Sequence, residues 1–115
     1  MSRIALVVED DNAMLTIYER MLISLDYEVI AARNGADAIS VLDEVTPDII
    51  FLDVLMPRVN GLHVIDYIAG KSHLHNVRLI VASSNAQFEK EAHSLPNAEF
   101  ILKPIRPAKI RELAE

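Results

Sequence analysis

The chain has 115 residues, of which 51% are hydrophobic and 24% charged, and its formal net charge is −6. That length suits one domain around one core. The negative charge argues against a nucleic-acid-binding surface, and the lack of cysteine excludes disulfide frameworks and thiolate metal sites. No apolar run approaches membrane-spanning length, and the first run is too short for a signal peptide. We therefore expect a cytoplasmic protein with a single domain over residues 1–115 and no contact with membrane or nucleic acid.

The first predicted strand is the apolar run RIALVV at residues 3–8. A helix should follow, because apolar side chains then recur at spacings of three and four residues and so share one stripe. These side chains are Met14, Ile17, Met21 and Leu25. Either Asp11 or Asn12 can cap the start of this helix.

A weaker β-rich run, YEVIAA at residues 27–32, predicts the second strand. The next dipeptide, Asn34-Gly35, resembles a hairpin turn. A helical stripe follows it rather than an alternating pattern, so we interpret it as a strand-to-helix turn. The stripe consists of Ala38, Ile39, Leu42 and Val45.

The third predicted strand, PDIIFLD at residues 47–53, is apolar until it ends in Asp53. Such a run fits a strand buried on both faces of a parallel sheet. A carboxylate inside that strand would be costly, but one at its carboxyl end points into the crevice where open α/β sheets bind ligands. A helix should follow, with Asn60 as its cap and the stripe Leu62, Ile65 and Ile68.

Two more strand–helix units complete the chain. Strands are predicted at residues 77–83 and 99–103, and Asn85 can cap the helix between them, whose thin stripe is Phe88, Ala92 and Leu95. Pro107 suits the first turn of a last helix. That helix, with Ile110, Leu113 and Ala114 on one side, is cut short by the end of the chain.

Strict alternation of strands and helices predicts an α/β fold, a doubly wound parallel sheet with helices on both faces. Five strands fit the flavodoxin-like order 2-1-3-4-5. The alternative is half of a Rossmann fold. Its glycine fingerprint should follow the first strand, where VVEDDNAM contains no glycine.

In the order 2-1-3-4-5, polar side chains gather at one edge of the sheet. The first strand ends in Glu9, Asp10 and Asp11, while Asp53, Ser83 and Lys103 end the third, fourth and fifth. Like charges near 4 Å repel by about 4 kcal/mol at an effective dielectric of about 20. Protonation, a salt bridge to Lys103, or a divalent cation such as Mg²⁺ would relieve this repulsion.

This set of groups is suited to phosphoryl transfer. A carboxylate such as Asp53 can attack phosphorus and form an aspartyl phosphate. A cation and Lys103 would stabilise the charge on the phosphoryl oxygens. The Ser83 hydroxyl could donate a hydrogen bond to the bound group.

Four motifs in order resemble the receiver domain of two-component response regulators. They are LVVED with the acidic pair Glu9 and Asp10, FLDVLMPRVNGL with Asp53, LIVASS with Ser83, and FILKP with Phe100 and Lys103. The resemblance covers essentially the whole chain. It implies that Asp53 is the phosphoacceptor, that Ser83 and Phe100 are switch residues, and that the Lys103–Pro104 bond is cis.

The resemblance further implies a Mg²⁺ site and signalling partners. Asp10 and Asp53 would bind the ion directly, Glu9 through water, and Leu55 through its backbone carbonyl. A sensor histidine kinase or a histidine phosphotransfer protein would donate the phosphoryl group. Output would pass through the face of helix four, strand five and helix five to a partner, an effector domain or a second copy of the chain. Such a chain is a signalling switch rather than an enzyme with a separate substrate.

Some features depart from the family pattern. The segment NAQFEKEAHSLPNAEF, between the fourth and fifth strands, is shorter than usual and lacks a glycine turn. Leu55 is apolar where many members are polar, so we expect slow loss of phosphate. The short last helix leaves open whether the chain acts alone or belongs to a longer regulator or hybrid kinase.

Two other functions are weighed against the switch. One is a binding module of the same fold whose interactions ignore phosphorylation, against which the intact set of acids, hydroxyl and lysine counts. The other is a phosphohydrolase on a related sheet. It would need a second acid two residues after Asp53, where the chain has Leu55.

Overall fold

The structure is a computed structural model that describes residues 3–53, 61–84 and 95–115. Its strands form one parallel sheet in the order β2-β1-β3-β4-β5. The strands are β1 (Arg3–Val8), β2 (Tyr27–Ala32), β3 (Ile49–Asp53), β4 (Arg78–Ser83) and β5 (Ala98–Leu102). This confirms the predicted flavodoxin-like α/β fold.

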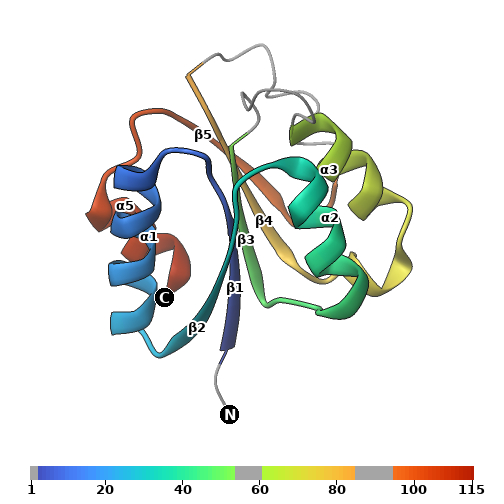
Figure 1. Cartoon of the computed structure of the whole chain (residues 1–115), viewed down its shortest axis with the longest axis horizontal. Helices are drawn as coiled ribbons and strands as arrows, with labels where there is room; N and C mark the ends of the chain where they lie inside the picture. The colour runs from blue at the N-terminus through green and yellow to red at the C-terminus, as the bar shows by residue number, and fades with distance from the viewer. Residues whose placement is uncertain (1–2, 54–60, 85–94) are drawn as a thin grey trace.

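Helices cover both faces of the sheet, with α1 and α5 on one side and α2 and α3 on the other (Figure 1). The helices are α1 (Asn12–Ser24), α2 (Gly35–Glu44), α3 (Gly61–Ala69) and α5 (Pro107–Ala114), with a short 3₁₀ turn η1 (Ser72–Leu74) before β4. The short last helix agrees with the prediction. The predicted caps Asn60 and Asn85, and the stripe residues Phe88 and Ala92, lie outside the described residues.

The hydrophobic core has two parts, one on each face of the sheet, because successive side chains of a strand point to opposite faces. In β1, Ala5 and Val7 pack toward α1 and α5, while Leu6 and Val8 pack toward α2 and α3. In β3, Phe51 joins the first cluster, and its ring lies 5.1 Å from the ring of Tyr18 in α1. The central strands are therefore buried on both faces, as their apolar runs indicated.

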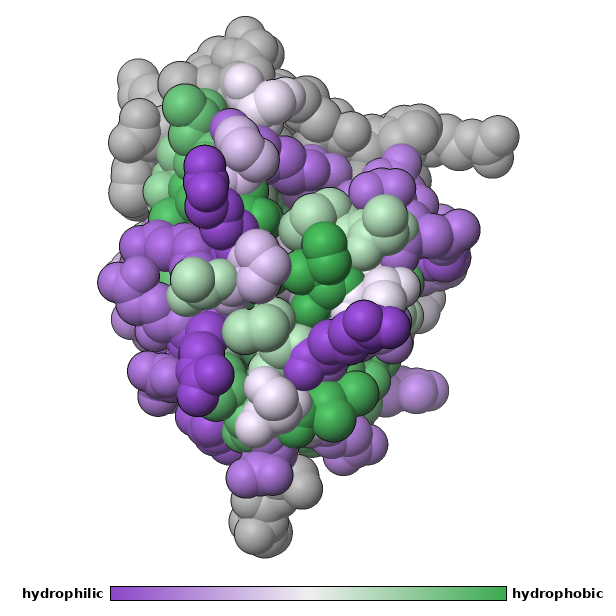
Figure 2. Space-filling model, turned by 90° about the vertical axis from the view of Figure 1, so that its left-hand side faces the viewer, coloured by the Kyte–Doolittle hydropathy of each residue, from purple (hydrophilic) through white to green (hydrophobic). Residues whose placement is uncertain are grey.

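The side of α1 that is buried against the sheet lies one residue further along the chain than the predicted stripe. Its buried side chains are Leu15, Tyr18 and Leu22. The predicted residues Met14, Ile17, Met21 and Leu25 are partly buried at the edge of the same cluster. Two stripes with the same spacing share this helix, so the period alone did not decide which one faces the sheet. Figure 2 shows this side of the molecule, where apolar side chains reach the surface between hydrophilic ones.

Local signals at the helix starts are confirmed. The Asp11 side chain accepts a hydrogen bond from the backbone N–H of Met14, so Asp11 rather than Asn12 caps α1. The Asn34 side chain accepts the N–H of Asp37, which makes Asn34-Gly35 a helix start. Pro107 lies in the first turn of α5.

Three strands have bounds that differ from the predictions. Strand β4 begins at Arg78 rather than at residue 77. Strand β3 begins at Ile49 rather than residue 47, because Asp48 bonds the backbone of Ile4 through both its N–H and its carboxylate. Strand β5 spans Ala98–Leu102 and ends before Pro104, which has no N–H. In the described ranges, no helix combines the length and the apolar character needed to cross a bilayer.

Candidate functional site

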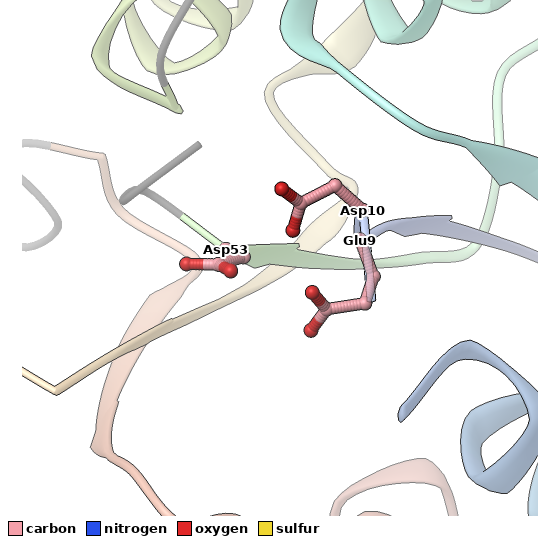
Figure 3. A group of neighbouring side chains, drawn as sticks. All are labelled: Glu9, Asp10 and Asp53. Carbon is pink, nitrogen blue, oxygen red and sulfur yellow. The ribbon is translucent and has the colours of Figure 1, made fainter. Parts of the chain in front are cut away.

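Three carboxylates meet where β1 and β3 end. Glu9 and Asp10 follow β1 directly, and Asp53 is the last residue of the neighbouring β3. One carboxylate oxygen from each residue lies within 4.8 Å of the others. Figure 3 shows the Glu9 and Asp10 side chains diverging from the end of β1, with Asp53 beside them. The strand order thus brings together acids that are more than forty positions apart.

Lys103 holds two of these acids. Its Nζ atom lies 2.9 Å from Oδ2 of Asp53 and 3.7 Å from Oε1 of Glu9. Lys103 reaches these acids from the end of β5. Its backbone N–H donates a hydrogen bond to the Ser83 carbonyl. Burial alone would lower the pKa of Lys103. The hydrogen bond to Asp53 and the charges of Asp53, Glu9 and Asp10 outweigh this and raise the pKa. The side chain is therefore an ammonium at neutral pH.

Glu9 is the most buried of the three acids, with 2% of its surface exposed. Its Oε2 accepts the backbone N–H of Asp11 at 3.2 Å. Burial raises the pKa of Glu9 above 4.5, and the charges of Asp53 and Asp10 act in the same direction. Lys103 and the Asp11 N–H counteract this only in part. Without a bound cation, the charged form of Glu9 is therefore less favourable in this pocket than it is in water.

Asp53 and Asp10 face different surroundings. Asp53 is 6% exposed and bonded to Lys103. Asp10 is exposed at the rim of the site. A site with one reachable rim carboxylate and two buried ones can take an ion that keeps part of its water shell.

The predicted switch residues lie on neighbouring strands. Ser83 is fully buried at the end of β4. It follows Ala82, which pairs with Asp53 across β3 and β4. Phe100 in β5 pairs with Val81 and is half-buried against the α2/α3 side of the core. The predicted ligand Leu55 lies outside the described residues.

An apolar cavity adjoins the site and was not predicted. Its volume is about 290 Å³. It is lined by Met14, Ser84, Lys103, Pro104 and Ile105. The Lys103–Pro104 peptide bond beside it is cis, as the resemblance implied.

Arg33 is a second feature that sequence reasoning missed. It lies directly after β2, and its guanidinium donates hydrogen bonds to the Asp10 carbonyl and the Asn12 side chain. A basic residue at the carboxyl end of a strand next to β1 was the available signal.

The donor set fits a hard divalent cation. All three side chains offer carboxylate oxygens, with no nitrogen or sulfur ligand in the group. Mg²⁺ prefers such ligands and keeps several of its waters. A divalent charge would also offset the repulsion among the acids, which adds to the effect of burial on the pKa of Glu9.

Comparison with known proteins identifies the fold family. The family model described as the response regulator receiver domain matches residues 5–115. The chain belongs to the response regulator receiver family. As a receiver domain it is 32% identical to the chemotaxis protein CheY of Listeria monocytogenes over 111 residues, which is 96% of this chain and 93% of that one.

Other relatives of this receiver domain are longer. It is 30% identical to the Regulator of RpoS of Escherichia coli K12 over 94% of this chain, but spans only 32% of that protein. Among solved structures, CheY4 of Vibrio cholerae matches with a TM-score of 0.88 at 19% identity, covering 98% of this chain and 96% of that one. The receiver domain of the sensor histidine kinase PA1611 from Pseudomonas aeruginosa, solved with a magnesium ion in its active site cleft, matches with a TM-score of 0.86 at 23% identity, covering 99% and 95%.

Proposed function

We propose that this receiver domain is a phosphorylation switch, a single unit over residues 1–115, in which Asp53 accepts a phosphoryl group. One observation carries the proposal: a buried carboxylate at the end of β3 is bonded to Lys103 at 2.9 Å and lies within 4.8 Å of two further acids. A strand-end carboxylate with only a structural role would not need this costly grouping of like charges.

The reaction is nucleophilic attack by the Asp53 carboxylate on phosphorus. A bond forms between the carboxylate oxygen and phosphorus, while the bond from phosphorus to the donor breaks and the leaving group takes its electron pair. The donor is a phosphohistidine of a sensor kinase or phosphotransfer protein. Lys103 stabilises the charge on the transferring oxygens, and the Ser83 hydroxyl donates a hydrogen bond to the bound phosphoryl group.

Glu9, Asp10 and Asp53, with the backbone carbonyl of Leu55, are the residues that would hold Mg²⁺. When bound, the ion neutralises charge on the acids and on the phosphoryl oxygens. In the described structure, Lys103 is paired with Asp53, and Asp10 is the exposed carboxylate of the three.

The output follows from a two-state equilibrium biased by the new charge. Ser83 moves toward the phosphoryl group, and Phe100 turns inward from its half-buried position in β5. The face built around β5 and α5 then changes shape and binds an effector domain, a partner or a second copy of the chain. We propose that the protein acts in the cytoplasm.

The test is phosphorylation by a small donor. Wild-type protein is incubated with Mg²⁺ and acetyl phosphate, and intact-mass spectrometry should detect one added phosphoryl group. Asp53→Ala should abolish it. Asp66→Asn, which alters an exposed carboxylate on α3, should leave it intact. No mass shift in wild type, or an undiminished shift in Asp53→Ala, defeats the proposal.

The same preparation separates the alternatives. Partner binding that is equal for the phosphorylated and unphosphorylated protein would indicate a phosphorylation-independent binding module. Turnover of a generic phosphoester in the presence of Mg²⁺ would indicate a phosphohydrolase.

A further inference from the structure

Arg33 links the segment after β2 to the segment after β1 by hydrogen bonds at the rim of the acidic site. Its Nη2 atom donates to the backbone oxygen of Asp10 at 3.5 Å and to Oδ1 of Asn12. One guanidinium amino group carries two N–H bonds, so it can serve both acceptors at once. The loop after β2 is therefore fastened to the loop after β1 at the residue that carries a carboxylate of the site.

The three acids differ in how they are held. Glu9 and Asp53 are each held by the Lys103 ammonium, and Glu9 also accepts the Asp11 N–H. Within residues 3–53, 61–84 and 95–115, no hydrogen bond or ion pair holds the exposed Asp10 carboxylate itself. The contact from Arg33 to its backbone is thus the side-chain anchor that the described structure provides for Asp10.

We propose that Arg33 is a positioning residue of the cation site, which keeps the Asp10 carboxylate beside Glu9 and Asp53 by holding its backbone. This rests on the proposed function, since it takes the three acids as the Mg²⁺ site. Residues that orient metal ligands typically contribute about 10–100-fold in affinity. Arg33 acts on the backbone rather than on the carboxylate, so we expect a contribution below that range, about three- to tenfold.

Arg33 also carries a positive charge, which repels a cation. Its side chain is exposed, so solvent and salt screen that repulsion. Positioning and repulsion predict opposite changes in Mg²⁺ affinity when Arg33 is removed. Weaker Mg²⁺ binding without Arg33 would therefore support positioning, and tighter binding would indicate repulsion.

The experiment is a calorimetric Mg²⁺ titration of wild type, Arg33→Ala and Arg33→Lys. Lysine keeps the charge but lacks the planar guanidinium. Both variants should raise the Kd for Mg²⁺ by about three- to tenfold, because alanine has no donor and the lysine Nζ, one bond nearer the backbone than Nη2, does not reach both acceptors. Asn12→Ala should raise it by less, since the Asp10 contact remains. Arg20→Ala, which removes the same charge from an exposed position on α1, should leave the Kd unchanged.

A second measurement needs no metal. In the metal-free protein, ¹⁵N relaxation should show greater motion of the Asp10, Asp11 and Asn12 amides in Arg33→Ala than in wild type. The urea midpoint should be unchanged, which separates positioning from a general loss of stability.

Wild-type affinity in Arg33→Lys, tighter binding by Arg33→Ala, or unchanged amide motion would each overturn the proposal. If wild type itself fails to bind Mg²⁺, the proposed function fails, and the role of Arg33 falls with it. If Arg33→Ala does not fold, the Lys variant and Asn12→Ala still decide the question.

Discussion

Lys103 is the residue on which the site's electrostatics depend most directly. It is the cation that contacts both buried acids in the described structure, and its raised pKa keeps it charged. Removing it leaves Asp53 and Glu9 as uncompensated buried carboxylates, which is costly. The same change removes a positive group from the place where phosphoryl charge would develop in the proposed reaction.

Lys103→Met should therefore slow the phosphorylation of Asp53 by acetyl phosphate by about a hundredfold or more, the scale for losing one charge-stabilising donor. The initial rate is followed by intact mass at saturating Mg²⁺. Lys109→Met provides the control, because Lys109 is a partly exposed residue of α5 that pairs with Glu112 rather than with the acids of the site. Equal rates for Lys103→Met and wild type would contradict the role assigned to the ammonium.

Glu9 predicts a pH dependence of stability in the metal-free protein. Because burial raises the pKa of Glu9 above 4.5, the folded state binds this proton more tightly than the unfolded state. The resulting stabilisation is fully present below pH 4.5 and is lost as the pH rises through the raised pKa. Glu9→Gln removes this loss, so its stability relative to wild type should increase as the pH rises from 4.5 to neutrality.

Urea unfolding at a series of pH values measures this difference. Glu28→Gln, at an exposed position of β2, should run parallel to wild type throughout. If the free energies of unfolding of Glu9→Gln and wild type differ by the same amount at every pH, the pKa of Glu9 is not raised in the folded state.

At the scale of elements, α5 is fastened to the sheet by side chains from three strands. Tyr27 in β2 donates its hydroxyl to the Ala114 carbonyl at 2.8 Å, and the Arg3 guanidinium bonds the same oxygen and lies over the Tyr27 ring. Arg78 in β4 bonds the Leu113 carbonyl at 2.6 Å. The last carbonyls of a helix have no hydrogen-bond partner within it. These contacts supply partners for the carbonyls of Leu113 and Ala114, at the end of this short helix.

Tyr27→Phe should lower the free energy of unfolding by about 1 kcal/mol, because it removes a buried hydrogen bond and leaves the ring in place. Tyr67→Phe is the matched control. It removes a hydroxyl that bonds Asp43 at the surface, where water replaces the lost partner. Urea denaturation should show a smaller change for Tyr67→Phe; the reverse order would mean that Tyr27 does not anchor α5.

At the scale of the whole molecule, the proposed cation site would couple Mg²⁺ binding to folding. The unfolded chain separates Asp53 from Glu9 and Asp10, so Mg²⁺ should bind the folded state preferentially. At a free Mg²⁺ concentration ten times the Kd, stability should rise by about 1.4 kcal/mol. Thermal unfolding should show a Tm that rises with Mg²⁺, and Asp10→Asn should shift that rise to higher concentrations. A Tm that is insensitive to Mg²⁺ in wild type would contradict the cation site.

The sequence alone determined the order of the elements, the parallel sheet and the set of strand-end groups. Apolar runs such as residues 49–52, helical spacing, and caps such as Asp11 and Asn34 are local signals, and strict alternation leaves few topologies. Glu9, Asp10, Asp53, Ser83 and Lys103 could be named because the carboxyl ends of parallel strands meet at one edge.

Only the tertiary structure decided which side of α1 faces the sheet, how deeply Glu9 is buried, and that Arg33 reaches the Asp10 backbone. Each of these depends on packing between segments distant in sequence. A 3.6-residue period is compatible with either of two adjacent stripes, and no local pattern reports the burial of a carboxylate or the reach of a long side chain across a loop.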